Sequence, residues 1–65
     1  MPFIDVTVAE GCAPAQLRAL IRELTDAASR ALGSPQTNVR VVIREVPLTH
    51  WAAGDVTIAE RRSVS

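Results

Sequence analysis

The chain has 65 residues, and its seven basic residues, all arginine, are balanced by seven acidic ones for a formal net charge of zero. That length allows one domain at most, residues 1–65, and a neutral chain without a basic stripe is not expected to bind nucleic acid or an anionic membrane surface. With one Phe, one Trp, no Tyr and a single Cys, the chain has few large apolar side chains and no internal disulfide, so oligomerisation is the expected route to a stable core.

The sequence contains no run of 18 apolar residues, so it predicts no membrane-spanning helix. Its first residues lack the basic and apolar regions of a signal peptide. The lone Cys12 suits a reducing compartment, and no zinc-ligand cluster accompanies it. We therefore expect a cytoplasmic protein.

Residues 2–9 alternate, with Ile4, Val6 and Val8 on one face and Phe3, Asp5 and Thr7 on the other. A period of two over this length predicts a half-buried strand.

Pro2 opens this strand and has two possible roles. It is tolerated as the first residue of a strand, where it does no harm. If Met1 is removed, however, its nitrogen becomes a secondary amine that can accept and return a proton near neutral pH. If Met1 is retained, that nitrogen is an amide and cannot act as a base.

A helix is predicted over Pro14–Leu32, after a turn at Gly11. Pro14 suits the first helical position, because its missing N–H is not needed there. Apolar residues recur at spacings of three and four, while most arginines and acids fall on the other, solvated face. Gly33 is expected to end the helix, and Pro35 prevents its continuation.

A second strand is predicted over Val39–Val46. A helix of matching length between two strands indicates a βαβ unit with parallel strands and a right-handed crossover, hence an α/β (α+β) fold class. One helix covers only one face of such a sheet. We expect the other face, with Phe3, Val42, Arg40 and Arg44, to be covered by further copies of the chain.

Pro47 ends the second strand, and a loop with His50 and Trp51 follows. Residues 55–58 are expected to form a short strand or one arm of a hairpin. Residues 59–65 are expected to be a polar, flexible tail.

These features together resemble the 4-oxalocrotonate tautomerase family, from Pro2 to about Ile58. The resemblance is carried by Met1-Pro2, the βαβ pattern, Val39-Arg40-Val41 and the aromatic Trp51. It also includes the segments Glu10-Gly11 and Leu20-Ile21-Arg22-Glu23, and Pro35. It implies a tautomerase-like fold with a short C-terminal hairpin arm, assembled as a homohexamer (a trimer of dimers) or as a heterohexamer of two related chains. It also implies an isomerase that uses no metal and no cofactor.

The resemblance further implies how the site residues act. Pro2 would be the general base that takes a proton from a 2-hydroxy-dienoate or enol acid and returns it at another carbon, giving the conjugated 2-oxo acid. Arg40, from a neighbouring subunit, would hold the substrate carboxylate and 2-oxygen, and Trp51 would help make the pocket apolar. Arg40 in an intersubunit ion pair and Trp51 in interface packing are the structural alternatives; no role is assigned to His50.

The sequence departs from the family pattern at Cys12, where the family usually has a second arginine for the far carboxylate of a diacid. Three interpretations are open: the substrate is a monoacid, Arg18 or Arg44 substitutes, or a second chain supplies the missing residue. The alternative function is therefore a non-catalytic or partner subunit of a heterohexamer with this fold. The glycine-rich turn after the aromatic is also altered, to Ala52-Ala53-Gly54-Asp55.

Overall fold

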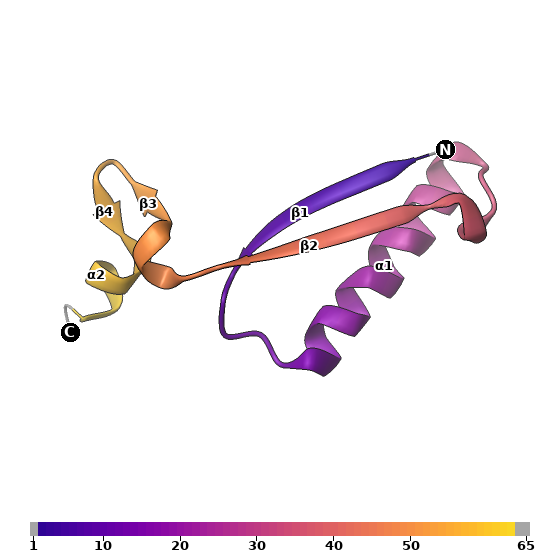
Figure 1. Cartoon of the computed structure of the whole chain (residues 1–65). Coiled ribbons are helices and arrows are strands. Elements are labelled where there is room, and N and C mark those ends of the chain that lie inside the picture. Colours follow the sequence, from indigo (N-terminus) through magenta and orange to yellow (C-terminus); the bar gives the residue numbers. More distant parts are fainter. Residues whose placement is uncertain (1, 64–65) are drawn as a thin grey trace.

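The computed structural model describes residues 2–63, which form a βαβ body followed by a small C-terminal arm (Figure 1). The body consists of strand β1 (Phe3–Ala9), helix α1 (Pro14–Leu32) and strand β2 (Arg40–Val46). The strands are parallel, in a register that pairs Phe3 with Arg40 and Ala9 with Val46. The predicted βαβ unit is therefore confirmed, with the first and second strands each one residue shorter at the start than expected.

Local interactions explain the helix bounds, which match the prediction. Pro14 occupies the first helical position, and the Gln16 side chain accepts the backbone N–H of Ala13 at 2.8 Å. This bond compensates for the alanine at the cap, which has no side-chain acceptor. At the other end, Gly33 adopts a left-handed φ of 67° and its N–H donates to the Ser29 carbonyl at 2.9 Å. Glycine adopts this conformation without strain, so the helix ends there.

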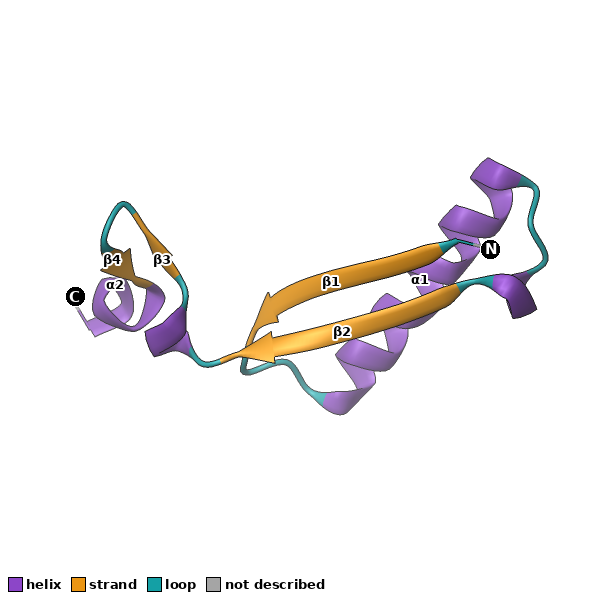
Figure 2. Ribbon diagram, turned by 45° about the horizontal axis from the view of Figure 1, so that its top comes forward, coloured by secondary structure: helices purple, strands orange, loops and turns teal. Residues whose placement is uncertain are grey.

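Helix α1 covers one face of the two-stranded sheet and leaves the other open (Figure 2). The strands alternate as predicted: Val41 and Ile43 are half-buried, whereas Phe3 and Val42 are 65% and 40% exposed. Within residues 2–63, Val39 is the only buried apolar residue, at 8% exposure. The accessible surface is 4758 Å², against about 4,000 Å² expected for a folded chain of this mass. A single chain thus leaves much of its apolar surface uncovered.

The arm consists of a 3-10 turn (Leu48–His50), an antiparallel hairpin and helix α2 (Ile58–Ser63). The hairpin pairs two strands of two residues each, β3 (Ala52–Ala53) and β4 (Val56–Thr57). The predicted hairpin arm is confirmed. Figure 1 shows that the arm stands beyond the end of β2, away from the body. The radius of gyration, 15.1 Å, accordingly exceeds the ~11 Å expected for a compact chain of this length.

The tail expected over residues 59–65 contains a helix, since residues 59–63 belong to α2. Thr57 and Glu60 form a reciprocal cap: the Glu60 N–H donates to Thr57 Oγ1, and the Thr57 N–H donates to Glu60 Oε1, each at 3.1 Å. Such a capping box starts a helix. The last two positions of the expected tail, 64 and 65, lie outside the described residues.

Candidate active site

Pro2 and Arg40 lie together at the amino end of the sheet. The Arg40 backbone N–H donates to the Pro2 carbonyl at 3.0 Å, and Phe3 is paired with Arg40 in the strand register. Parallel strands place their starts at one edge, so residues far apart in the sequence become neighbours. Two of the three predicted site residues are thus brought together within one chain. Met1, whose removal would expose the Pro2 amine, lies outside the described residues.

The Arg40 side chain is exposed and bonded only to its own loop. Its Nη1 donates to the Thr37 carbonyl at 2.7 Å, in the 3-10 turn before β2 (Gln36–Asn38). Across residues 2–63 no carboxylate lies within ion-pair distance of it. A guanidinium has five N–H donors, so Arg40 retains donors and an uncompensated charge for an anionic ligand.

Arg44 lies further along the same face and forms an ion pair with Asp5. Its Nε and Nη2 donate to the two carboxylate oxygens of Asp5 at 3.0 and 3.2 Å, a bidentate pair that joins β2 to β1. The hydrogen bond from Arg44 lowers the pKa of Asp5 below its ordinary value, and the same bond raises the pKa of Arg44. Sequence reasoning missed this pair, although both residues were predicted on the open face, because only the strand register shows that they meet.

Trp51 lies at the opposite end of the chain from Pro2. It lies in the arm, directly after the 3-10 turn Leu48–His50, and the seven residues of β2 before that turn span about 23 Å. Its indole is 39% exposed, and its carbonyl accepts the N–H of Ile58 at 2.9 Å. One chain therefore does not bring Trp51 to Pro2, and the two can share a pocket only if different copies of the chain supply them.

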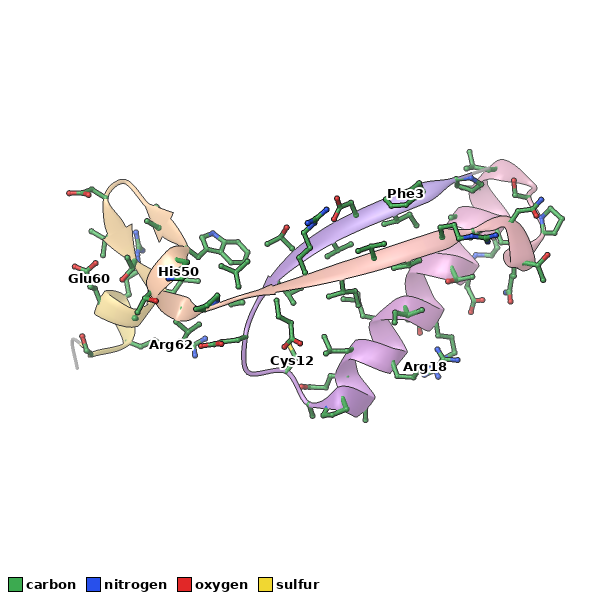
Figure 3. All side chains as sticks on the ribbon, in the orientation of Figure 1. Phe3, Cys12, Arg18, His50, Glu60 and Arg62 are labelled. Atoms are coloured by element: carbon green, nitrogen blue, oxygen red, sulfur yellow. The ribbon has the colours of Figure 1, made fainter. Side chains whose placement is uncertain are left out.

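Cys12 and Arg18 are also remote from the amino end of the sheet. Cys12 is an exposed free thiol in the loop that follows the carboxyl end of β1. Arg18 lies on the flank of α1 that faces away from the strands (Figure 3), where it lines an open, polar depression with Arg22 and Asp26. Arg18 therefore does not join Arg40 within one chain.

Comparisons with known proteins agree over nearly the whole chain. The family model described as "Tautomerase enzyme" matches residues 2–61. A 2-hydroxymuconate tautomerase of Pseudomonas putida is 40% identical over 60 residues, which are 92% of this chain and 95% of that protein. One of Stutzerimonas stutzeri is 43% identical over 54 residues, 83% of this chain and 86% of that protein.

Two solved structures are similarly close. TomN, a 4-oxalocrotonate tautomerase homologue in the tomaymycin biosynthetic pathway, superposes with a TM-score of 0.93 at 44% identity, covering 95% of both chains. A heterohexamer 4-oxalocrotonate tautomerase from Chloroflexus aurantiacus superposes with a TM-score of 0.89 at 40% identity, covering 92% of this chain and 97% of that one.

The parallel βαβ unit with its short arm, together with the family match over residues 2–61, defines a tautomerase. The chain belongs to the 4-oxalocrotonate tautomerase family, and it is an isomerase of the keto–enol tautomerase class. No helix among the described residues is long and apolar enough to cross a membrane.

Proposed function

We propose that this tautomerase interconverts 2-hydroxy-dienoate or enol acids with the corresponding 2-oxo acids, without a cofactor, and that Pro2 is its general base once Met1 is removed. The observation that supports the proposal is the position of Pro2 and Arg40 at the same end of the sheet, where the Arg40 backbone N–H donates to the Pro2 carbonyl. The resemblance assigns the guanidinium that serves a given Pro2 to a neighbouring copy of the chain. A base and a fixed cation at one edge are the two groups that proton transfer in an enol acid requires.

The mechanism moves one proton. The neutral prolyl nitrogen accepts the proton of the substrate 2-hydroxyl and leaves a dienolate, whose negative charge is spread over the oxygen and the conjugated carbons. The Arg40 guanidinium stabilises that charge and grips the carboxylate. The protonated amine then returns the proton to a carbon of the conjugated chain, which gives the 2-oxo acid and regenerates the base.

A complete site requires more than one copy of the chain under this proposal. Pro2 lies at the amino end of the sheet, and Trp51 lies beyond the carboxyl end. An oligomer that sets the arm of one chain against the sheet of another would place an apolar indole near the prolyl amine, where it disfavours the protonated form. The uncovered sheet face, with Phe3 at 65% exposure, supports such an assembly, and we propose a homohexamer.

The decisive experiment replaces Pro2 with Ala and follows ketonisation of phenylenolpyruvate and 2-hydroxymuconate by ultraviolet absorbance. General bases contribute about 10²–10⁴-fold, so we expect kcat/KM to fall by at least ~100-fold in Pro2→Ala. Intact mass must show loss of Met1 in both proteins. Native mass spectrometry must show the same assembly, since Pro2 contributes its carbonyl and not its ring to the strand bond. Near-normal turnover by Pro2→Ala would show that a primary amine serves as well as the prolyl amine, and turnover by protein that retains Met1 would exclude the N-terminal amine as the base.

A second candidate function is that of a partner subunit in a heterohexamer. It is favoured by Cys12, which cannot bind a carboxylate as a guanidinium does, and by the resemblance to a chain of a heterohexameric tautomerase. Native mass spectrometry of the chain expressed alone separates the two. A stable, active homo-oligomer would show that the chain needs no partner, whereas an inactive monomer or aggregate would favour the partner-subunit function.

A further inference from the structure

The open face of the sheet carries two arginines, and the chain neutralises only one of them. Arg40, Val42 and Arg44 are spaced two residues apart along β2, so their side chains point to the same face. The two arginines are about 13 Å apart along the strand. Arg44 is held by both oxygens of Asp5, whereas the Arg40 guanidinium, within residues 2–63, donates only to the Thr37 carbonyl.

The Asp5–Arg44 pair occupies the Nε/Nη2 edge of the Arg44 guanidinium and neutralises its charge, so the donors that Arg44 retains lack the net charge that would attract a second carboxylate. The fork of the guanidinium matches two carboxylate oxygens, and both bonds are made within the chain. The strand register holds Asp5 diagonally across from Arg44, because Asp5 pairs with Val42 and Thr7 pairs with Arg44. An acid arriving from solution must displace a carboxylate that is tethered at high effective concentration.

The remaining arginines belong to other elements: Arg18, Arg22 and Arg30 lie on α1, which covers the opposite face of the sheet (Figure 2), and Arg61 and Arg62 lie on α2 in the arm. Arg18 and Arg22 line the depression on α1, and Arg18 faces away from the strands (Figure 3). Arg61 lies in the arm, where its Nη2 donates to the Ala53 carbonyl at 3.4 Å. Beside Arg40 the sheet face is apolar, with exposed Phe3 in register with it and Val42 two residues along.

We propose that the Asp5–Arg44 pair is a specificity element, which restricts this tautomerase to enol acids with a single carboxylate and an uncharged, apolar remainder. Asp5 withholds the second guanidinium of the sheet, so Arg40 alone is available to an anionic group. The inference rests on the proposed function, because it assigns the substrate carboxylate to Arg40.

The test is the substitution Asp5→Asn, which keeps the size of the side chain and removes its charge. Freed from its partner, Arg44 becomes available to a second carboxylate, and one charge-assisted hydrogen bond is worth about tenfold or more in affinity. We expect the ratio of kcat/KM for 2-hydroxymuconate over phenylenolpyruvate to rise at least ~10-fold, with the monoacid rate within about twofold of wild type. The double variant Asp5→Asn/Arg44→Gln should lose the gain. Asp55→Asn, the same change in the arm, should leave the ratio unchanged.

A binding measurement separates this inference from the proposed function. Trp51 fluorescence or calorimetry with two unreactive acids, cinnamate and cis,cis-muconate, reports selectivity without turnover. If the wild-type chain binds cinnamate more tightly and Asp5→Asn reverses or narrows the difference, the specificity element stands even where turnover fails. An unchanged ratio in Asp5→Asn would overturn it while leaving Pro2-dependent catalysis intact. A wild-type preference for the diacid would also overturn the specificity element. The variants Arg61→Ala and Arg62→Ala would then test whether the arm supplies the second cation.

Discussion

The βαβ body (residues 2–46) and the C-terminal arm (residues 48–63) are held by different kinds of interaction. The body depends on a ladder between strands that are distant in the sequence, and on inward-facing strand side chains such as Ile4, Val41 and Ile43 that are only half-buried. The arm depends on bonds between near neighbours, such as Ile58 N–H to Trp51 O and the Thr57–Glu60 cap. The body therefore leaves apolar surface uncovered, whereas the arm obtains its shape from local bonds.

The two regions also carry different parts of the proposed chemistry. The body holds Pro2 beside Arg40, and the arm carries Trp51 beyond the far end of β2. If this division is correct, damage to the body should abolish folding or assembly. Damage to the arm should instead lower activity or local order by smaller amounts.

The largest effect is expected from Val39→Asp. Val39 is the residue with the least exposure in the body, at 8%, and an unpaired charge buried there costs several kcal/mol. A chain this small has about that much stability to lose, so we expect circular dichroism to show no cooperative unfolding transition. Asn38→Asp places the same charge one residue away on an exposed position and should fold normally. A native spectrum for Val39→Asp would mean that the body does not depend on this residue.

The next largest effect is expected from Val42→Asp in the body, compared with the same substitution, Val56→Asp, in the arm. Val42 in the body and Val56 in the arm are 40% and 39% exposed, so an isolated chain should tolerate aspartate equally at both. If other copies cover the sheet face, Val42→Asp buries a charge at an interface. We expect sedimentation velocity to show dissociated Val42→Asp and assembled Val56→Asp. The opposite result would make the arm the assembling element.

A smaller effect is expected from Trp51→Ala. Loss of an apolar wall lets water stabilise the protonated prolyl amine, so the base stays protonated to higher pH. We expect kcat/KM to fall roughly tenfold at neutral pH, a loss of about 1.4 kcal/mol in transition-state stabilisation. The acid limb of the pH–rate profile should move to higher pH. His50→Ala, at the neighbouring exposed position, is the control and should leave the profile in place. A tenfold loss with an unmoved acid limb would assign Trp51 to packing instead.

The body was predictable from sequence because its signals are periodic. Alternation over residues 2–9 and 39–46 and the three-and-four spacing of the helix specify which faces are apolar, and Pro14 and Gly33 specify the helix bounds. The pairing of Asp5 with Arg44 was not predictable, since it depends on how far one strand is shifted along the other. That shift becomes visible only when both strands are placed in the sheet.

The arm was predicted less well because its elements are too short for periodicity. Helix α2 has six residues, fewer than two turns, so no apolar stripe identifies it. Its signal was instead the spacing Thr57-Ile58-Ala59-Glu60, a hydroxyl followed three residues later by a carboxylate. The candidate site divides in the same way. The strand pattern of the body places Pro2 and Arg40 at the starts of the two strands, whereas one chain does not determine what lies near Trp51.

The smallest effect is expected from Thr57→Ala, which removes the hydroxyl that accepts the Glu60 N–H. An N-cap of this kind is worth about 1 kcal/mol. Because the arm is held locally, we expect amide exchange to accelerate in α2 and to stay unchanged in β1 and β2. Thr49→Ala, an exposed threonine of the preceding turn, is the matched control. Faster exchange throughout the body would show that the arm stabilises the whole chain.

The same cap predicts a pH dependence that is confined to the arm. The backbone N–H of Thr57, and then its side chain, stabilise the Glu60 carboxylate and hold the pKa of Glu60 below its ordinary value. A carboxyl whose pKa is lower in the folded than in the unfolded state stabilises the fold above its ordinary pKa, and this stabilisation is lost as pH falls through the lowered value. Exchange in α2 should therefore quicken in that acidic range, after correction for the intrinsic rate. Glu60→Gln retains a hydrogen-bond acceptor but has no titrating proton, so its corrected exchange in α2 should not change with pH over this acidic range. If exchange in Glu60→Gln quickens as it does in wild type, a group other than Glu60 controls the opening of the arm at low pH.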